Sequence, residues 1–386
     1  MLNKRSICFI LVLTVFYVGI GLGNSLFTFR GDNSFSKYSE VAKDVTGPRN
    51  DEFAKTAKEA IDKISSVIGD SRQVMRTCSK NNVEKLYYEY NKFSSRVDAY
   101  YNGVVDNEPT GIIPLQNKLT ELESQNKTDT YQFKKLKKQL NTLTKLGAPE
   151  FENVILWESL YEGLNGILLI ILLFFPLVFL ISSVYTKEVS TGMDNILLSS
   201  VKGRTSMVFA KLGAVSVTCI IFCFIYFTAS FLGNFLPYGM NFTGATASVR
   251  CLSFMSNSPL NMSIQSFVLL TFTWVTLTSL VVGIITSLIS SLLKNHATVF
   301  GCSIIVLLLS ILFEALGSEI VTRVQLILDF CFTNTISVST IFGSFACYPI
   351  LRAVCPYWLC VLIVFLLICS LVFVALLYQQ KHRTIA

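Results

Sequence analysis

The sequence predicts an all-α polytopic membrane protein with six transmembrane helices, a large helical extracellular domain between helices 1 and 2, and a re-entrant hairpin between helices 5 and 6. Two observations favour this fold class. Of the 386 residues, 52% are hydrophobic and 15% are charged, whereas a soluble protein carries about a quarter charged residues. The charges are also uneven, because residues 28–158 hold 39 of the 57. This composition excludes a disordered chain, a disulfide-rich miniprotein and an ordinary soluble enzyme.

Six apolar stretches are candidates for membrane spans, since one span needs about 20 apolar residues. The fifth is shorter than that but begins and ends beside charged residues. The first follows Lys4 and Arg5 as a signal peptide would, yet it has no small-residue cleavage site, and Gly19 and Gly23 suit close helix packing. We therefore expect an uncleaved helix in residues 1–29. The six stretches are Ser6–Phe29, Leu164–Val184, Leu212–Leu232, Ile264–Leu293, Ala297–Phe313 and Ala353–Gln380.

Basic residues in short loops predict the orientation, because cytosolic loops carry an excess of Lys and Arg. With the N-terminus inside, nine basic residues lie in the cytosolic loops and termini and three lie in the short outer loops. This asymmetry predicts a multi-pass protein of the cell membrane with both termini cytosolic, residues 30–158 outside, and residues 159–386 forming helices 2–6. The nine are Lys4, Arg5, Lys187, Lys202, Arg204, Lys211, Lys294, Lys381 and Arg383, and the three are Arg250, Arg323 and Arg352.

The charged insert shows helical spacing in three runs, Asn50–Lys80, Val83–Tyr101 and Leu115–Leu143. The third run resembles a coiled-coil seam, and its polar residues Asn126 and Asp129 are either a bend or a register device. A bundle or stalk of about three long helices is expected. Its basic run of Lys134, Lys135, Lys137 and Lys138 is more typical of a solvated helix face than of a binding patch.

Cysteine and histidine usage gives little sign of a chemical site. Cys347 and Cys355 flank the last outer loop and could pair, but spacing alone does not give their geometry. There is no C-x-x-C motif, and His296 and His382 are the only histidines. A His-based metal site or a Ser-His-Asp triad is therefore not expected, and no catalytic residue is assigned.

The segment from about residue 186 to 204 predicts a short amphipathic helix at the cytosolic surface. Ile196, Leu197 and Leu198 supply its apolar side, and Gly192 and Gly203 bracket it as turn points. Such a helix could dock a cytosolic partner or serve as an inert interfacial anchor. Physical reasoning from the residues leaves both readings open.

The pattern Glu188-x-x-x-Gly192-x-x-x-x-Leu197-Leu198-x-x-x-x-Gly203-Arg204, with Lys211 opening the next span, resembles the membrane subunits of ABC-2 type (type V exporter-like) ABC transporters. The resemblance implies that this loop is a coupling helix that sits in a groove of the ATPase. The chain departs from the pattern at Gly192-Met193, where relatives commonly have Gly-Thr, and in having only about five residues before its first span.

The resemblance also implies a function and partners. The expected function is the permease subunit of an ATP-driven exporter that moves an amphipathic substrate, such as a peptide, antimicrobial, drug or lipid, out of the cell. The sequence has no G-x-x-x-x-G-K-[ST] loop, so the chain is not expected to be an enzyme or to bind a cofactor. Two ATPase copies would bind ATP and Mg²⁺, and a second permease subunit would complete a homodimer or heterodimer in the lipid bilayer, with no nucleic acid. The alternative is a non-transporting membrane sensor or immunity protein whose outer domain binds a partner.

The connection of about residues 318–352 is too polar for two further spans but rich in apolar residues. Backbone at membrane depth needs shelter from lipid, so a re-entrant helical hairpin is expected, and in similar transporters this region forms the gate. Glu162, Glu314 and Asp329 are candidates for the gate or substrate path, because charges at membrane depth mark function. Simple hydration at the interface is the other reading of these carboxylates.

Overall fold

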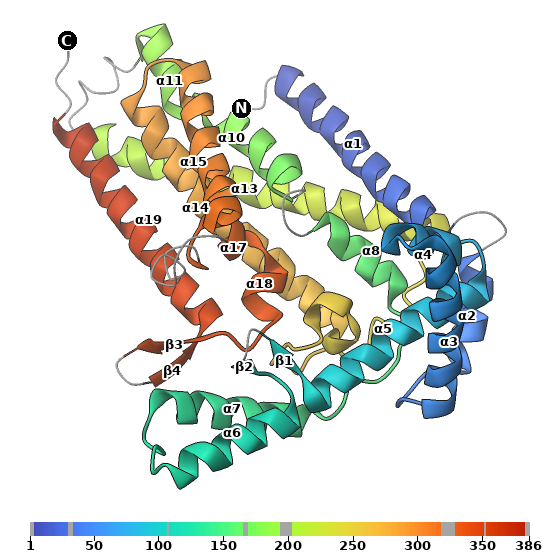
Figure 1. The fold of residues 1–386 in the computed structure, drawn as a ribbon. Coiled ribbons are helices and arrows are strands. Elements are labelled where there is room, and N and C mark those ends of the chain that lie inside the picture. Colours follow the sequence, from blue (N-terminus) through green and yellow to red (C-terminus); the bar gives the residue numbers. More distant parts are fainter. Residues whose placement is uncertain are drawn as a thin grey trace. The chain divides into compact units, whose positions relative to one another are not determined.

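A computed structural model of the chain describes residues 4–29, 34–105, 108–164, 169–193, 203–317, 329–350 and 353–382, which are mostly helical (Figure 1). The chain divides into two compact units. Unit 1 comprises residues 1–162, 230–268 and 342–356, and unit 2 comprises residues 163–229, 269–341 and 357–386.

Unit 1 contains the charged insert and is built mainly from short helices. The helices are α1 (Lys4–Thr28), α2 (Phe35–Lys43), α3 (Asp51–Ile68), α4 (Ser71–Cys78), α5 (Asn82–Asn102), α6 (Ile112–Ser124), α7 (Tyr131–Leu146) and α8 (Ile155–Gly163). Three single 3₁₀ turns are η2 (Leu236–Tyr238), η3 (Val249–Cys251) and η4 (Ser253–Met255). The antiparallel strand pairs are β1 (Val104–Val105) with β2 (Glu108–Pro109), and β3 (Cys347–Ile350) with β4 (Ala353–Pro356).

Unit 2 holds most of the long apolar helices. A π-helical turn η1 (Ile170–Phe174) leads into α10 (Phe175–Ile181) and α11 (Ser183–Thr191). The remaining helices are α13 (Gly203–Phe235), α14 (Ile264–Leu292), α15 (His296–Gly317), α17 (Phe332–Ile336), α18 (Val338–Phe342) and α19 (Tyr357–His382). The end of α13 and the start of α14 belong to unit 1.

Among the described residues, four helical segments are long and apolar enough to cross a membrane. They are Ile170–Glu188, Thr205–Tyr238, Ile264–Leu292 and Tyr357–Lys381. The predicted first and fifth spans appear as shorter apolar helical segments, Leu11–Gly23 and His296–Leu312. The structure thus supports several membrane spans, and the total of six stays a prediction.

The first helical run of the insert is broken, where the sequence predicted one long helix. The side chain of Asn50 caps α3 by accepting hydrogen bonds from the backbone N–H groups of Glu52 and Phe53. Gly69 ends α3 with φ of 70°, a left-handed conformation that favours glycine. The run therefore forms α3 and α4 as two helices.

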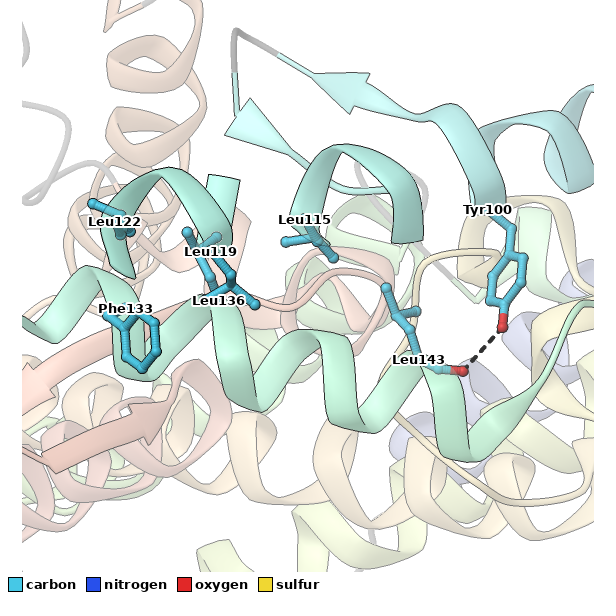
Figure 2. Close-up of a cluster of buried hydrophobic side chains, with 7 residues drawn as sticks. All are labelled: Tyr100, Leu115, Leu119, Leu122, Phe133, Leu136 and Leu143. Carbon is cyan, nitrogen blue, oxygen red and sulfur yellow. Dashed lines mark hydrogen bonds between the residues drawn. The ribbon is translucent and has the colours of Figure 1, made fainter. Parts of the chain in front are cut away.

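The third run also folds back on itself instead of forming one long seam (Figure 2). Asn126 adopts φ of 54° between α6 and α7, and the side chain of Thr130 then caps α7. The leucines of the heptad-like pattern face one another across the resulting hairpin, and the Tyr100 hydroxyl donates a hydrogen bond of 3.2 Å to the Leu143 carbonyl. The polar residues midway thus mark a reversal of direction. The buried cluster is Tyr100, Leu115, Leu119, Leu122, Phe133, Leu136 and Leu143.

Close helix packing in unit 1 uses a different glycine from the predicted pair. A Cβ atom added to Gly233 would lie 2.7 Å from the Val18 carbonyl oxygen and 2.8 Å from the Gly21 Cα. Cβ atoms added to Gly19 or Gly23 would meet nothing within 4 Å among the described residues. In this contact Gly21 of α1 packs on Gly233 of α13, and packing of another helix at Gly19 and Gly23 stays a prediction.

The predicted re-entrant segment is described only in part, because residues 318–328 and 351–352 lie outside the described residues. The described part contains α17, α18 and the β3–β4 hairpin, in which Tyr348 pairs with Cys355. The sequence did not predict this strand pair. Cys347 and Cys355 do not form a disulfide in it.

Candidate functional site

The described residues nearest to the predicted coupling segment form a buried cluster in unit 2. Tyr185 of α11, Val208 of α13 and Leu376 of α19 are each at most 2% exposed and pack together. Partly buried side chains from the same helices and from α14 surround them. Four helices therefore meet at this point. The surrounding side chains are Val184, Met207, Leu212, Leu288, Val372, Phe373 and Leu377.

An ion pair lies against this cluster. The Lys211 Nζ atom of α13 lies 2.5 Å from a carboxylate oxygen of Glu188 on α11, and the two side chains are 10% and 27% exposed. The same Nζ atom lies 3.8 Å from the centre of the Tyr185 ring, a cation–π distance. An ammonium group buried in an apolar bundle is costly unless it is paired. The arrangement therefore joins α11 to α13 by charge as well as by packing.

A serine of α14 forms hydrogen bonds with backbone groups at the irregular junction between α10 and α11. The helix is interrupted at Ser182, and the Ser290 hydroxyl accepts a hydrogen bond of 3.1 Å from the Tyr185 backbone N–H. The same hydroxyl donates a bond of 2.9 Å to the Ser182 carbonyl. Breaks in apolar helices are tolerated where side chains satisfy the freed backbone groups. This bond also fixes α14 beside the Glu188–Lys211 pair.

Further polar contacts tie the other helices of unit 2 together. Gln379 of α19 and Ser291 of α14 exchange two hydrogen bonds of 2.6 and 2.9 Å. The His296 Nε2 atom of α15 lies 2.8 Å from the Ser182 hydroxyl and 3.2 Å from the Phe179 carbonyl oxygen. Polar and aromatic contacts at this site thus hold α10, α11, α13, α14, α15 and α19 together.

The structure places the predicted coupling residues as follows. Gly192 directly follows α11 with φ of 71°, which fits a turn that favours glycine. Gly203 and Arg204 begin α13. Leu197 and Leu198 lie outside the described residues. Glu188, predicted to bind a partner, is engaged by Lys211 of its own chain.

The three carboxylates predicted for a gate or substrate path occupy different places. Glu162 belongs to unit 1, whereas Glu314, in α15, and Asp329 belong to unit 2. The Asp329 backbone carbonyl accepts a hydrogen bond from the Tyr357 hydroxyl. The side chain of Glu314 lies outside the description.

Glu162 lines a cavity of about 140 Å³ in unit 1 together with Glu89, Lys92 and Glu158. Glu158 accepts a hydrogen bond of 2.7 Å from the Ser253 backbone N–H. Burial raises the pKa of Glu158, the nearby charge of Glu89 raises it further, and Arg96 and Lys92 oppose the change. Burial likewise raises the pKa of Glu162. The described cavity lining contains three carboxylates and two ammonium groups, those of Lys85 and Lys92.

Metal binding finds no support in the part of the chain that the structure describes. Within those residues, no group of three or more His, Cys, Asp and Glu side chains could hold an ion.

Sequence reasoning missed the partners inside the bundle. The sequence identified Glu188 and Lys211 separately but not their pairing, nor the roles of Tyr185 and Ser290. One signal could have found the pair, because Lys211 is the only charge between Thr205 and Val249 and needs a neighbour in the bundle. Ser290 carries no comparable signal, since it is one of many hydroxyl residues on α14.

Comparison with known proteins gives one match. A family model described as ABC-2 family transporter protein matches residues 4–378, nearly the whole chain. No curated protein and no solved structure matches the chain. The match spans the described site and the segments on both sides of it.

Proposed function

Because the chain belongs to the ABC-2 family of transporter proteins, we propose that it is the permease subunit of an ATP-driven exporter. The family and the apolar helices make it a multi-pass membrane protein, and the family is the membrane component that associates with an ABC ATPase subunit. The match over residues 4–378 carries the proposal. The proposed substrate is amphipathic, and ATP and Mg²⁺ are bound by the partner ATPase.

We propose that the segment 186–204 is the docking helix for that ATPase. The segment begins in α11 and ends at the start of α13, and the Glu188–Lys211 pair links these two helices. A docking helix must transmit motion of the ATPase to the membrane helices, so the point where it joins α11 and α13 has to be fixed. In this proposal Leu197 and Leu198 supply the apolar contact with the ATPase, while Glu188 fixes the start of the docking segment to α13 through Lys211.

The assembly in this proposal contains two permease subunits and two ATPases in the cell membrane, with both chain termini cytosolic. Residues 30–158 then lie outside the cell, and residues 318–352, with Glu162, Glu314 and Asp329, contribute to the gate or substrate path. The nine-to-three distribution of basic residues supports this orientation. A cysteine that replaces exposed Lys127 should react with an impermeant thiol reagent on intact cells. If this cysteine is not labelled, the proposed orientation is wrong.

Purification of the tagged chain from its host tests the partner directly. A subunit with a nucleotide-binding P-loop should copurify, and replacing Leu197 and Leu198 by Asp should release it or uncouple its ATP hydrolysis. Val67, which is 85% exposed on α3, provides the control, because Val67→Asp adds charge in the proposed outer domain and should leave the complex intact. If no such subunit copurifies with the wild-type chain, the alternative of a non-transporting sensor gains ground.

A further inference from the structure

The outer side of the α6–α7 hairpin carries a groove that the proposed export function does not use. The groove has a volume of about 590 Å³ and lies between α7 and the segment at Pro259 and Asn261. Its α7 wall consists of residues spaced by three or four positions, which form one face of a helix. The wall residues are Lys134, Lys137, Lys138, Asn141, Thr142 and Lys145.

The charge of this wall is one-sided. Four of the residues lining the groove are lysines, and none of the described lining residues is acidic. Two other lysines of the hairpin lie close to carboxylates, Lys118 at 2.8 Å from Glu121 and Lys135 at 3.0 Å from Glu108. Inside the groove, Lys134 lies 3.8 Å from Asp129, whose side chain is fully exposed. The groove is therefore a concave region of positive potential.

The shape and residue types of the groove restrict its ligand. At 1.5 Å per residue, the face from Lys134 to Lys145 is about 16 Å long, so a single small anion would engage only part of it. Among the described residues that line the groove there is no arginine to grip planar carboxylates in a bidentate manner and no aromatic ring on which a nucleic acid base could stack. Lysine ammonium groups act as point charges that suit tetrahedral phosphate. The Asn141 amide adds hydrogen-bond donors, whereas the Thr142 hydroxyl already donates to the Lys138 carbonyl.

We infer that the α7 groove binds an extended, non-nucleic chain of phosphate groups. The ligand lies along α7, with successive phosphates next to the ammonium groups of Lys134, Lys137 and Lys145. Lys138 also donates a hydrogen bond of 3.3 Å to the Val354 carbonyl, so it helps to hold β4 beside α7 as well as facing the groove. Binding releases counterions from the phosphate chain and is therefore strongly dependent on salt.

The test uses the full-length protein in a neutral detergent and fluorescently labelled long-chain polyphosphate as the probe. Binding is measured by fluorescence anisotropy across a series of salt concentrations. The triple variant Lys134→Gln, Lys137→Gln and Lys145→Gln should weaken binding roughly tenfold or more and reduce the slope of log affinity against log salt by about 2. Lys138 is kept because of its bond to Val354.

Two further variants separate binding from folding and from general charge. Replacing Lys55, Lys58 and Lys63 by Gln removes the same charge from exposed positions of α3 and should leave binding unchanged. Replacing Lys134, Lys137 and Lys145 by Arg keeps the charge and should preserve most of the affinity. If the groove variant loses binding while the Arg variant retains it, the groove is the site.

Other polyanions decide the identity of the ligand. Polyglutamate of matched charge and single-stranded DNA should each bind at least about tenfold more weakly than polyphosphate. The described groove offers no arginine for bidentate binding of carboxylates and no aromatic ring on which bases could stack. Equal binding of either overturns the phosphate assignment. Three outcomes overturn the inference as a whole: the protein does not bind polyphosphate, the α3 variant loses as much affinity as the groove variant, or the protein binds only phosphatidylglycerol vesicles.

Discussion

Removing either partner of the Glu188–Lys211 pair should destabilise the protein by unequal amounts. Lys211 is 10% exposed and Glu188 is 27% exposed, so the ammonium group depends more on its partner than the carboxylate does. Breaking a fully buried ion pair costs about 3–5 kcal/mol. Because Glu188 retains some water, a smaller value applies here.

The two single variants follow from these exposures. Glu188→Gln leaves Lys211 buried with the Tyr185 ring as a neighbour, and we expect a loss of about 2–3 kcal/mol in unfolding free energy. Lys211→Met leaves a more hydrated carboxylate, and we expect a loss of about 1–2 kcal/mol. The double variant Glu188→Leu with Lys211→Met removes both charges and should lie within about 1 kcal/mol of the wild type.

The assay is unfolding in mixed micelles with increasing SDS, analysed as a double-mutant cycle with Glu188→Leu as the matching single variant. Exposed Lys187 is the adjacent control, and Lys187→Met should change stability by less than about 0.5 kcal/mol. The reasoning is refuted if the two single losses simply add in the double variant. It is also refuted if Lys211→Met costs more than Glu188→Gln.

Three further outcomes are expected. Gly233→Ala should lower the unfolding free energy by about 1–3 kcal/mol because its Cβ meets backbone atoms of α1, whereas Gly23→Ala should not; the same SDS titration compares them. Leu115→Ala should cost about 2–5 kcal/mol and raise hydrogen exchange in α6 and α7, while exposed Ile113→Ala should leave exchange unchanged. Burial lowers the pKa of Lys85 from 10.5 to about 8. The unfolded chain therefore keeps this proton to higher pH than the folded protein does, so the contribution of Lys85 to stability rises between pH 8 and 10.5. Lys85→Met should remove that rise from the melting temperature measured against pH.

Local signals were enough to predict the long apolar helices. The predicted span Ile264–Leu293 corresponds to α14 (Ile264–Leu292), because a long apolar run without Pro or charge has few alternatives to a helix. The last span begins at Tyr357, four residues after the predicted Ala353, because residues 353–356 pair as strand β4. That pairing depends on the chain at Cys347–Ile350 and leaves no sign in an apolar composition.

The heptad-like run shows where a pattern is insufficient. Its leucines predicted an apolar seam, and the cluster in the hairpin confirms that these residues pack together. The pattern does not state whether the partner helix belongs to another chain or to the other half of the same run. The left-handed backbone at Asn126 turns the chain back, so the partner is the other half of the same run. Asn is one of the residues that tolerate this conformation in turns.

The pairing of Glu188 with Lys211 changes what the predicted coupling segment can transmit. The two residues are 23 positions apart, and the helices that carry them are joined along the chain through residues 192–202 and in space by the ion pair. A force applied to that segment therefore acts on α11 and α13 together, since moving one without the other would separate the charges. Ser290 links α14 to α11 through its hydrogen bond with the backbone N–H of Tyr185. A partner that pushes on the segment would then shift three helices at once, which a loop attached to flexible helix ends could not achieve.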